Sequence, residues 1–225
     1  MQTQDITKHL QELKTEIELI IPEPALVNKM FVAGGCIRSM VRDQKIADYD
    51  IFLPDEGSVQ ELREALAYRQ VMYQSKNSIG LLSASGKHIQ FIVCAVGTPE
   101  QIVSEFDFTC NMSHFSFGTS ELVIHSDSLS NQLVINPNAR NVMGTFLRVG
   151  KFVNKGYAYP SRLDMIALGI KLTKHDPIDK YSELEESSRM AFSESETQAF
   201  EGVGFNIIMD VTPRSSDRIG SAGGA

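Results

Sequence analysis

Apolar and polar residues follow two periodicities along this chain. The N-terminal part contains both helical and strand periodicities, whereas the C-terminal part is helical. Ile6, Leu10, Leu13 and Ile17 recur at helical spacing and predict an amphipathic helix over residues 4–20. Beyond it, short apolar runs between turn residues predict strands, and longer periodic runs predict helices. The predicted elements are a short helix after Pro24, strands at 30–34 and 49–53 with a helix at 36–44 between them, a helix at 58–69, strands at 70–74, 79–84 and 88–94, a helix at 98–106, and strand candidates at 121–126 and 132–136.

From about residue 139 the pattern turns helical, with helices predicted over 139–156 and 161–175. The order of elements indicates an α/β (α+β) fold, with a mixed sheet in a head over residues 1–138. A small helical C-terminal subdomain follows over 139–185. The last part, 186–225, is acidic and ends in small polar residues, so we expect it to be partly disordered.

Composition is that of an ordinary globular protein, with 225 residues, 42% hydrophobic and 22% charged. No apolar run approaches the roughly eighteen residues of a membrane span, and the N-terminus lacks the blocks of a signal peptide. We therefore expect a cytoplasmic protein with no membrane partner. Cys36, Cys94 and Cys110 lie far apart in apolar stretches without a C-x-x-C motif, so we interpret them as reduced packing residues.

The net charge of −7 is unevenly distributed. Residues 148–180 contain seven Lys and Arg against three acids, whereas residues 181–225 contain eight acids against three arginines. The basic stretch is either a surface for the phosphates of an RNA or a solvated helix face. Under the first interpretation, Tyr157 and Tyr159 would be available to stack on bases.

The stretch FVAGGCIRSMVRDQKIADYDIFLP, residues 31–54, brings the most candidate functional residues together within a short segment. Asp48 and Asp50 alternate along a predicted strand, so both carboxylates share one face about 6.5 Å apart. Magnesium prefers such hard oxygen ligands, and two ions about 3.5–4 Å apart can stabilise the attacking and leaving oxygens of phosphoryl transfer.

The Gly-Gly turn in the same stretch suits a phosphate. Gly34 and Gly35 let the backbone approach an anion, and the following helix directs unpaired N–H groups to it. Arg38, in the first turn of that helix, adds a cation that can bind two oxygens. A strand–Gly-Gly–helix turn or a D-x-D pair alone is usually architectural. Together, at this spacing, they predict a site for a triphosphate and metal ions.

The spacing also resembles a known family. From Gly34, Arg38 lies at +4 and the two aspartates, Asp48 and Asp50, at +14 and +16. This is similar to the G-G-x-V-R-D-x(8)-D-x-D signature of the tRNA CCA-adding enzyme and bacterial poly(A) polymerase family, within the polymerase-β-like nucleotidyltransferase superfamily. The segment DFTCN, at 107–111, resembles the R-D-F-T-x-N motif of the same family.

The resemblance covers roughly residues 28–117 and implies a five-stranded nucleotidyltransferase head that uses two Mg²⁺ ions, with Mn²⁺ as an alternative. For Asp107 it leaves two roles open, one near the metals and one at the sugar or base. It implies metal ligation by Asp48 and Asp50, a triphosphate cradle of Gly34, Gly35 and Arg38, and nucleotide contacts by Asp107 and Asn111.

The chain departs from the family pattern at three places. Ser39 stands where the family has Asp, Phe106 where it has Arg, and Gln90 where many members of the superfamily have a third carboxylate. The E-D-x-x-R motif that selects C and A is absent, and the C-terminal part is too short for the domains that measure a tRNA. We therefore do not expect CCA addition.

We expect a magnesium-dependent nucleotidyltransferase that moves an NMP from an NTP, ATP among them, onto an acceptor and releases pyrophosphate. The family resemblance favours an RNA 3′ end as the acceptor, with tRNA included, and a protein hydroxyl or a small molecule stays open because the tail is not a recognised RNA module. One alternative is a catalytically inactive nucleotide-binding or interaction protein, which Ser39, Phe106 and Gln90 would favour. The retained Asp48 and Asp50 oppose it, because two carboxylates repel each other without a metal. The other alternative is a toxin-like transferase that modifies tRNA or a protein.

Overall fold

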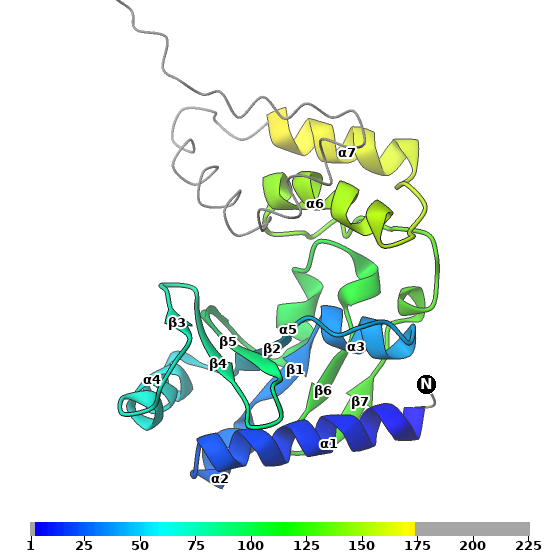
Figure 1. The fold of residues 1–225 in the computed structure, drawn as a ribbon. Helices are drawn as coiled ribbons and strands as arrows, with labels where there is room; N and C mark the ends of the chain where they lie inside the picture. The colour runs from blue at the N-terminus through cyan, green and yellow to red at the C-terminus, as the bar shows by residue number, and fades with distance from the viewer. Residues whose placement is uncertain (1–2, 174–225) are drawn as a thin grey trace, which may run out of the picture.

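The computed structural model describes residues 3–173, which form a head built around a sheet with two helices packed above it (Figure 1). Helix α1 (Thr3–Ile20) runs across the base of the head. Helices α6 (Val142–Asn154) and α7 (Arg162–Thr173) lie at the opposite end. The tail predicted over 186–225 lies outside the described residues.

The sheet has seven strands in the order β3-β4-β5-β2-β1-β6-β7. Strands β2 and β5 pair in parallel, and the other neighbours pair antiparallel. The parallel pair is joined by a crossover that contains α4 and the β3–β4 hairpin. The strands are β1 (Phe31–Ala33), β2 (Tyr49–Leu53), β3 (Tyr73–Gln74), β4 (Ser78–Leu82), β5 (His88–Val96), β6 (His114–Ser116) and β7 (Glu121–Val123).

Helices cover the sheet unevenly. Besides α1, α6 and α7, the described helices are α2 (Pro24–Lys29), α3 (Gly35–Val41), α4 (Glu56–Leu66), α5 (Pro99–Ser104) and the 3₁₀ helices η1 (Thr109–Asn111) and η2 (Ser126–Ser128). Local signals start several of them: Asp55 caps α4 by accepting a hydrogen bond from the Ser58 backbone N–H, and α5 begins with a capping box of Thr98 and Gln101.

The two faces of the sheet belong to separate cores. On one face, Val32, Ile51 and Phe91 pack with apolar residues of α1, α2, α3 and α4 in the main core. On the other face, the rings of Phe31 and Phe52 stack with centroids 5.5 Å apart in a smaller cluster that includes α5. Side chains alternate along β2, so Asp50 shares the second face with Phe52.

A third core joins the head to the helices above it. Phe108 and Cys110, which flank the start of η1, pack with Val149, Phe152 and Leu168 of α6 and α7. The rings of Phe108 and Phe152 lie 4.5 Å apart. The segment around η1 therefore contributes to both the head and the helical part.

The predicted α/β class with a mixed sheet is confirmed, but the sheet has seven strands rather than five. Strand β6 was not predicted, although it lies directly beside β1, because it is only three residues long. Residues 132–136, predicted as a strand candidate, form only isolated bridges. Ile135 pairs with Phe108 and Gln132 with Ala158, since this segment runs between the head and the helices.

The cysteines only partly fit the packing role expected of them. All three are free thiols, and Cys36 and Cys110 are buried as predicted. Cys94 is exposed, because it occupies an outward position near the end of β5.

Among residues 3–173, we find no helix with the length and apolar character required to cross a membrane.

Candidate functional site

The Gly-Gly turn and the aspartates meet at one end of the sheet. Strands β1 and β2 are antiparallel, and Ala33, at the end of β1, pairs with Asp50 near the start of β2. Gly34 follows at once with a φ of 89°, a conformation that favours glycine, and its N–H donates to the Ser113 carbonyl at 3.0 Å. Strand pairing therefore brings the turn beside the carboxylates.

The two aspartates form a pair of like charges at this end. Asp48 is exposed just before β2, and Asp50 is half-buried within it. Burial raises the pKa of Asp50, the nearby Asp48 carboxylate raises it further, and the positive charge of Lys151 on α6 lowers it. Without a cation, the pair is therefore electrostatically unfavourable in its fully ionised form.

Gln90 occupies the neighbouring position on β5. It pairs with Asp50 in the parallel ladder, and its Nε2 donates to Ser78 Oγ at 3.1 Å. The amide thus lies where the resemblance placed a third carboxylate. In the part of the chain that the structure describes, no group of three or more His, Cys, Asp or Glu side chains is arranged to hold a metal ion.

Arg38 and Asn111, both predicted to contact the nucleotide, are in direct contact with each other. Arg38 Nη1 donates to Asn111 Oδ1 at 3.2 Å, and Nη2 donates to Ser39 Oγ at 3.3 Å. The guanidinium carbon lies 4.9 Å from the centre of the Phe152 ring on α6. Arg38 is only 3% exposed, and its buried Nε lacks a hydrogen-bond partner among the described residues. Ser39, one of the departures from the family pattern, therefore helps to hold this arginine.

Asp107 contacts α6 instead of the aspartate pair. Its Oδ2 lies 2.8 Å from Arg148 Nε, and its Oδ1 accepts a hydrogen bond from Thr145 Oγ1 at 2.7 Å. Burial raises the pKa of Asp107, while the Arg148 charge and the Thr145 hydroxyl lower it. The structure thus shows Asp107 held by two residues of α6, and both roles left open for it stay predictions.

Phe106 forms an apolar wall over the turn. Its ring lies 5.8 Å from that of Phe52, and a Cβ added at Gly34 would lie 3.4 Å from Phe106 Cε2. The residue that replaces the arginine of the family therefore closes one side of the turn with an aromatic ring.

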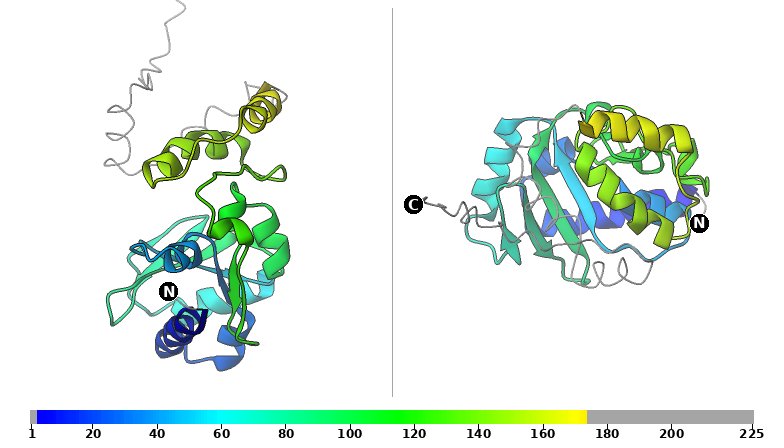
Figure 2. Two further views of the ribbon diagram at one scale, coloured as in Figure 1. Left: turned by 90° about the vertical axis from the view of Figure 1, so that its right-hand side faces the viewer. Right: turned by 90° about the horizontal axis from the view of Figure 1, so that it is seen from above.

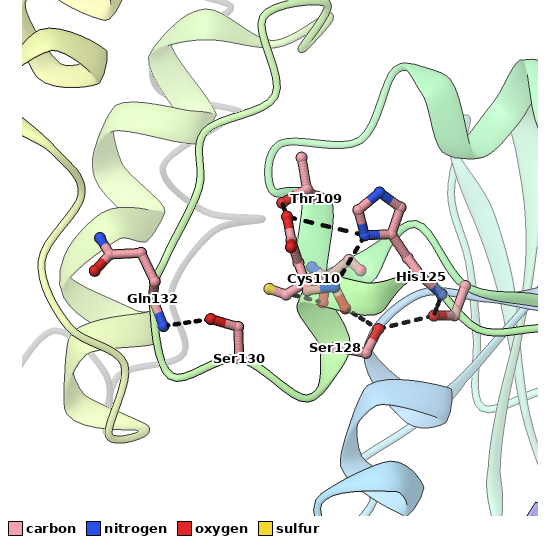
Figure 3. A network of polar contacts seen from close by, with 9 residues as sticks. Thr109, Cys110, His125, Ser128, Ser130 and Gln132 are labelled. Atoms are coloured by element: carbon pink, nitrogen blue, oxygen red, sulfur yellow. Dashed lines mark hydrogen bonds and ion pairs between the residues drawn. The ribbon is translucent and has the colours of Figure 1, made fainter.

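The 3₁₀ helix that carries Asn111 is held by a network of polar contacts (Figure 3). Ser128 Oγ donates to the Cys110 carbonyl at 2.9 Å, and Thr109 Oγ1 donates to Asp127 Oδ2 at 2.5 Å. His125 Nδ1 accepts a hydrogen bond from the Asp127 backbone N–H. These bonds tie η1, and with it the backbone of Asn111, to η2.

Residues of α6 are the part of the site that the sequence did not predict. Thr145, Arg148 and Phe152 lie on one side of the helix and contact Asp107 or Arg38. The sequence had placed Arg148 in a basic surface, and nothing in its spacing identified an acidic partner about forty positions earlier. The sequence carried one weak signal. Thr145, Arg148 and Phe152 are spaced three and four residues apart, so they lie on one side of a mostly apolar helix.

The basic stretch forms a smaller free surface than expected. Tyr157 is 3% exposed and packs against Phe152, so it is unable to stack on a base, whereas Tyr159 is 53% exposed. Arg148 is paired with Asp107, and Lys171 Nζ contacts the Pro137 carbonyl. The last lysines of the stretch, Lys174 and Lys180, lie beyond the described residues.

Comparisons with known proteins identify relatives of two kinds. The family model described as "Gabija anti-defense 2 family protein" matches residues 2–133. A curated protein named "Gabija anti-defense 2", from Bacillus phage SPbetaL7, is 26% identical over 171 residues, which cover 71% of this chain and 41% of that protein. The chain thus spans less than half the length of this relative.

Solved structures that share this fold include a tRNA-processing enzyme and a CCA-adding enzyme. A "tRNA-processing enzyme (apo form I)" superposes with a TM-score of 0.57 at 16% identity, over 87% of this chain and 55% of the other. A CCA-adding enzyme in complex with ATP gives a TM-score of 0.54 at 15% identity, over 78% and 45%. The head therefore has a nucleotidyltransferase-like fold. Because the family model covers more than half of the residues, the chain belongs to the Gabija anti-defense 2 family.

Proposed function

We propose that this protein is a metal-dependent nucleotidyltransferase that moves an NMP from an NTP onto an acceptor hydroxyl. The observation that carries the proposal is the pairing of Ala33 with Asp50, which sets the turn at Gly34 beside the D-x-D pair. The fold is that of nucleotidyltransferases, and the arrangement joins a Gly-Gly turn at the start of a helix to two carboxylates.

In the proposed reaction, the acceptor oxygen forms a bond to the α-phosphorus of the NTP. The bond from that phosphorus to the oxygen bridging the β-phosphate breaks, and pyrophosphate leaves with its electron pair. The hydroxyl proton passes to water. The protein would contribute mainly position and charge, as is usual for phosphoryl transfer.

The residues present fit a magnesium ion that arrives with the nucleotide. Mg²⁺ is commonly held by one or two carboxylates together with substrate phosphates and waters, which matches Asp48 and Asp50. The like charge of Asp48 raises the pKa of Asp50 beyond the effect of burial, and a cation held by both carboxylates would offset that repulsion. When bound, such ions would supply charge stabilisation to the reacting oxygens. Manganese, with similar ligand preferences, would substitute.

The nucleotide would extend from the turn towards α6. Gly34 and Gly35 would contact the phosphates through their backbone, and the Arg38 guanidinium, close to Gly35, would add positive charge to the same cradle. Asn111, which accepts a hydrogen bond from Arg38, would contact the sugar or base. Asp107 would influence the nucleotide through Arg148, its partner on α6.

For the acceptor, we keep an RNA 3′ end as the first candidate, on the likeness to tRNA-processing enzymes. A hydroxyl on a protein is the second, and two observations favour it. Tyr157 is buried and Arg148 is neutralised, which leaves less surface for RNA. The name of the relative, an anti-defence protein, also suggests a protein target. We propose that nucleotide transfer by this protein serves an anti-defence role.

The test is incorporation of each of four α-labelled NTPs, with Mg²⁺ or Mn²⁺, into total RNA and into cell protein. We expect label that depends on the metal and disappears in the Asp48→Asn/Asp50→Asn double variant. Asp43→Asn is the matched control, because Asp43 is exposed on the same loop and asparagine tolerates its φ of 53°.

Each result separates the candidates. Label in RNA identifies an RNA acceptor, and label in protein alone identifies a protein acceptor. If a folded protein gives no label above that of the double variant in either fraction, the transferase proposal is wrong. The inactive nucleotide-binding protein then becomes the better explanation.

A further inference from the structure

One row of paired residues crosses the sheet at the level of Asp50. Strand register links its positions from β3 to β6, and directly paired residues carry their side chains on the same face of a sheet. This set, the Asp50 row, consists of Tyr73, Gly80, Gln90, Asp50, Ala33 and His114. Its members therefore share the face of the sheet that bears the candidate site.

The two halves of this face are covered differently. On the side of β1, α5 packs with Phe31 and Phe52 in the smaller core. On the side of β3 and β4, Tyr73 is 44% exposed, and Leu82, two residues after Gly80, is 53% exposed. Seen from above, α6 and α7 do not cover β3 and β4 (Figure 2, right). This half of the face is therefore accessible to a ligand.

The Tyr73 ring lies directly over the backbone of Gly80. A Cβ added at Gly80 would lie 2.1 Å from Tyr73 Cε1, 2.4 Å from Cζ and 2.7 Å from Cδ1, so the ring occupies the space that a side chain would take. Because the ring rests on β4, the exposed part of Tyr73 faces away from the sheet. The open half of the face thus presents an aromatic surface held in a fixed place.

The geometry of transfer determines which half of the face the acceptor would use. The attacking and leaving oxygens lie on opposite sides of the reacting phosphorus. The Gly-Gly turn directly follows Ala33, on the β1 side of Asp50, so pyrophosphate would leave towards that side. The acceptor oxygen would then arrive from the β5 side, where Gln90 and Gly80 continue the Asp50 row.

The distance from Asp50 to the aromatic surface suits one nucleotide. Neighbouring strands lie about 4.8 Å apart, so Gly80 on β4 is roughly 10 Å from Asp50 on β2. This is comparable with the reach of a nucleotide from its base to its own 3′ oxygen. Bases stack on exposed aromatic rings in proteins that bind single-stranded nucleic acids. A base on Tyr73 would therefore bring its 3′ oxygen towards the aspartates.

From this placement, we infer that Tyr73, supported by Gly80, is the stacking platform for the 3′-terminal base of an RNA acceptor. The inference rests on the proposed function and identifies the class of its acceptor as a single-stranded RNA end. Every base has a π-face, so the platform would accept RNA ends of any sequence. Leu82, on the same face of β4, would add an apolar contact beside the platform.

Binding of RNA to the full chain tests the inference without requiring transfer. The probe is a short single-stranded oligoribonucleotide with fluorescein at its 5′ end, titrated by fluorescence anisotropy with Mg²⁺. We expect Tyr73→Ser to weaken binding by about tenfold, because one base loses its stacking partner, and Tyr73→Phe to stay within about twofold of wild type. A second probe, with an abasic ribose at its 3′ end, should bind wild type weakly and should lose nothing further in Tyr73→Ser.

A second variant tests the platform with the tyrosine in place. The methyl group of Gly80→Ala would displace the Tyr73 ring from the strand, so binding of the intact probe should weaken although the ring remains. Tyr68→Ser is the matched control and should bind like wild type, since Tyr68 is 100% exposed and follows α4, which packs on the opposite face. An aromatic ring over a glycine also stabilises a sheet edge, so thermal unfolding of all variants separates lost affinity from lost stability.

The outcomes distinguish this inference from the proposed function. Equal affinity of wild type and Tyr73→Ser for the intact probe overturns it, as does a Tyr73→Ser loss that is the same for both probes. Wild type that does not bind the intact probe also overturns it, whereas label in protein alone would then leave the transferase proposal standing. If the loss is confined to the intact probe, the inference stands, even where no transfer is detected. Where Tyr73→Ser does not fold, the same comparison with Gly80→Ala decides.

Discussion

At the scale of single residues, the two glycines of the turn have different tasks. Gly34 has a positive φ of 89°, and an added Cβ would lie 3.4 Å from the Phe106 ring. Gly35 begins α3, and a Cβ there would meet only Arg38 Nη2 at 3.9 Å, an ordinary contact. The first glycine is therefore needed by the fold, whereas the second is needed only if a ligand approaches the backbone.

This difference gives a prediction for two alanine variants. Gly34→Ala should lower the free energy of unfolding by about 1–2 kcal/mol, because alanine is strained in the left-handed region. Gly35→Ala should leave stability unchanged or slightly higher, yet weaken NTP binding, since its methyl group would occupy the space of a phosphate. Urea unfolding and calorimetry on both variants give the comparison. Full nucleotide affinity in Gly35→Ala would mean that no phosphate is bound at this turn.

Residue patterns predicted one part of the site and missed the other for a physical reason. The turn and Asp48 and Asp50 are close in sequence, so strand alternation and spacing were enough to bring them together. The burial of Arg38 depends on Phe152, more than a hundred positions later. Local spacing carries no signal for such a contact, and the predicted metal and nucleotide roles of individual residues stay predictions.

At the scale of elements, α1 is tied to the β4–β5 hairpin through Glu16. Lys87 Nζ contacts Glu16 Oε1, and Ser85 Oγ donates to Oε2 at 2.7 Å. Burial alone would raise the pKa of Glu16, but the hydrogen bonds from Lys87, Ser83 and Ser85 outweigh it and lower the pKa to about 2. The helix was predicted from its apolar spacing, but this polar attachment was not, because it joins residues seventy positions apart.

The lowered pKa predicts how stability depends on pH. Glu16 has a lower pKa in the folded state than in the unfolded state, so its contribution is complete above about pH 4.5 and is lost as pH falls towards 2. Glu16→Gln should therefore cost about 1 kcal/mol at pH 7 and roughly half of that near pH 3. Urea unfolding at both values measures this. Glu12→Gln, on the exposed side of α1, is the control, and an equal loss from both variants would contradict the assignment.

At the scale of the whole molecule, the site depends on the docking of α6 and α7 onto the head. Arg42, the residue directly after α3, donates a hydrogen bond to the Ser130 carbonyl, and its guanidinium carbon lies 4.6 Å from the centre of the Tyr157 ring. Together with the third core, these contacts hold the helices over the sheet end. The sequence predicted both parts and a boundary near residue 138, which stays a prediction, but not the contacts that join them. Hydrophobic periodicity reports that a face is buried without identifying its partner.

The ion pair between Asp107 and Arg148 is the contact through which this docking can be measured. Burial outweighs the attraction in its effect on Asp107, since the pKa is raised despite an oxygen–nitrogen distance of 2.8 Å. The intact pair is therefore expected to add little net stability, but removal of one partner leaves the other charge partly buried.

Asp107→Asn and Arg148→Met should each lower the free energy of unfolding by about 1–2 kcal/mol. The double variant should lose clearly less than the sum, because neither charge is stranded. Chemical unfolding of the wild type, the two single variants and the double variant gives the four free energies of this double-mutant cycle. Additive losses would show that the two side chains act independently, and would contradict the proposed link from Asp107 through Arg148 to the nucleotide.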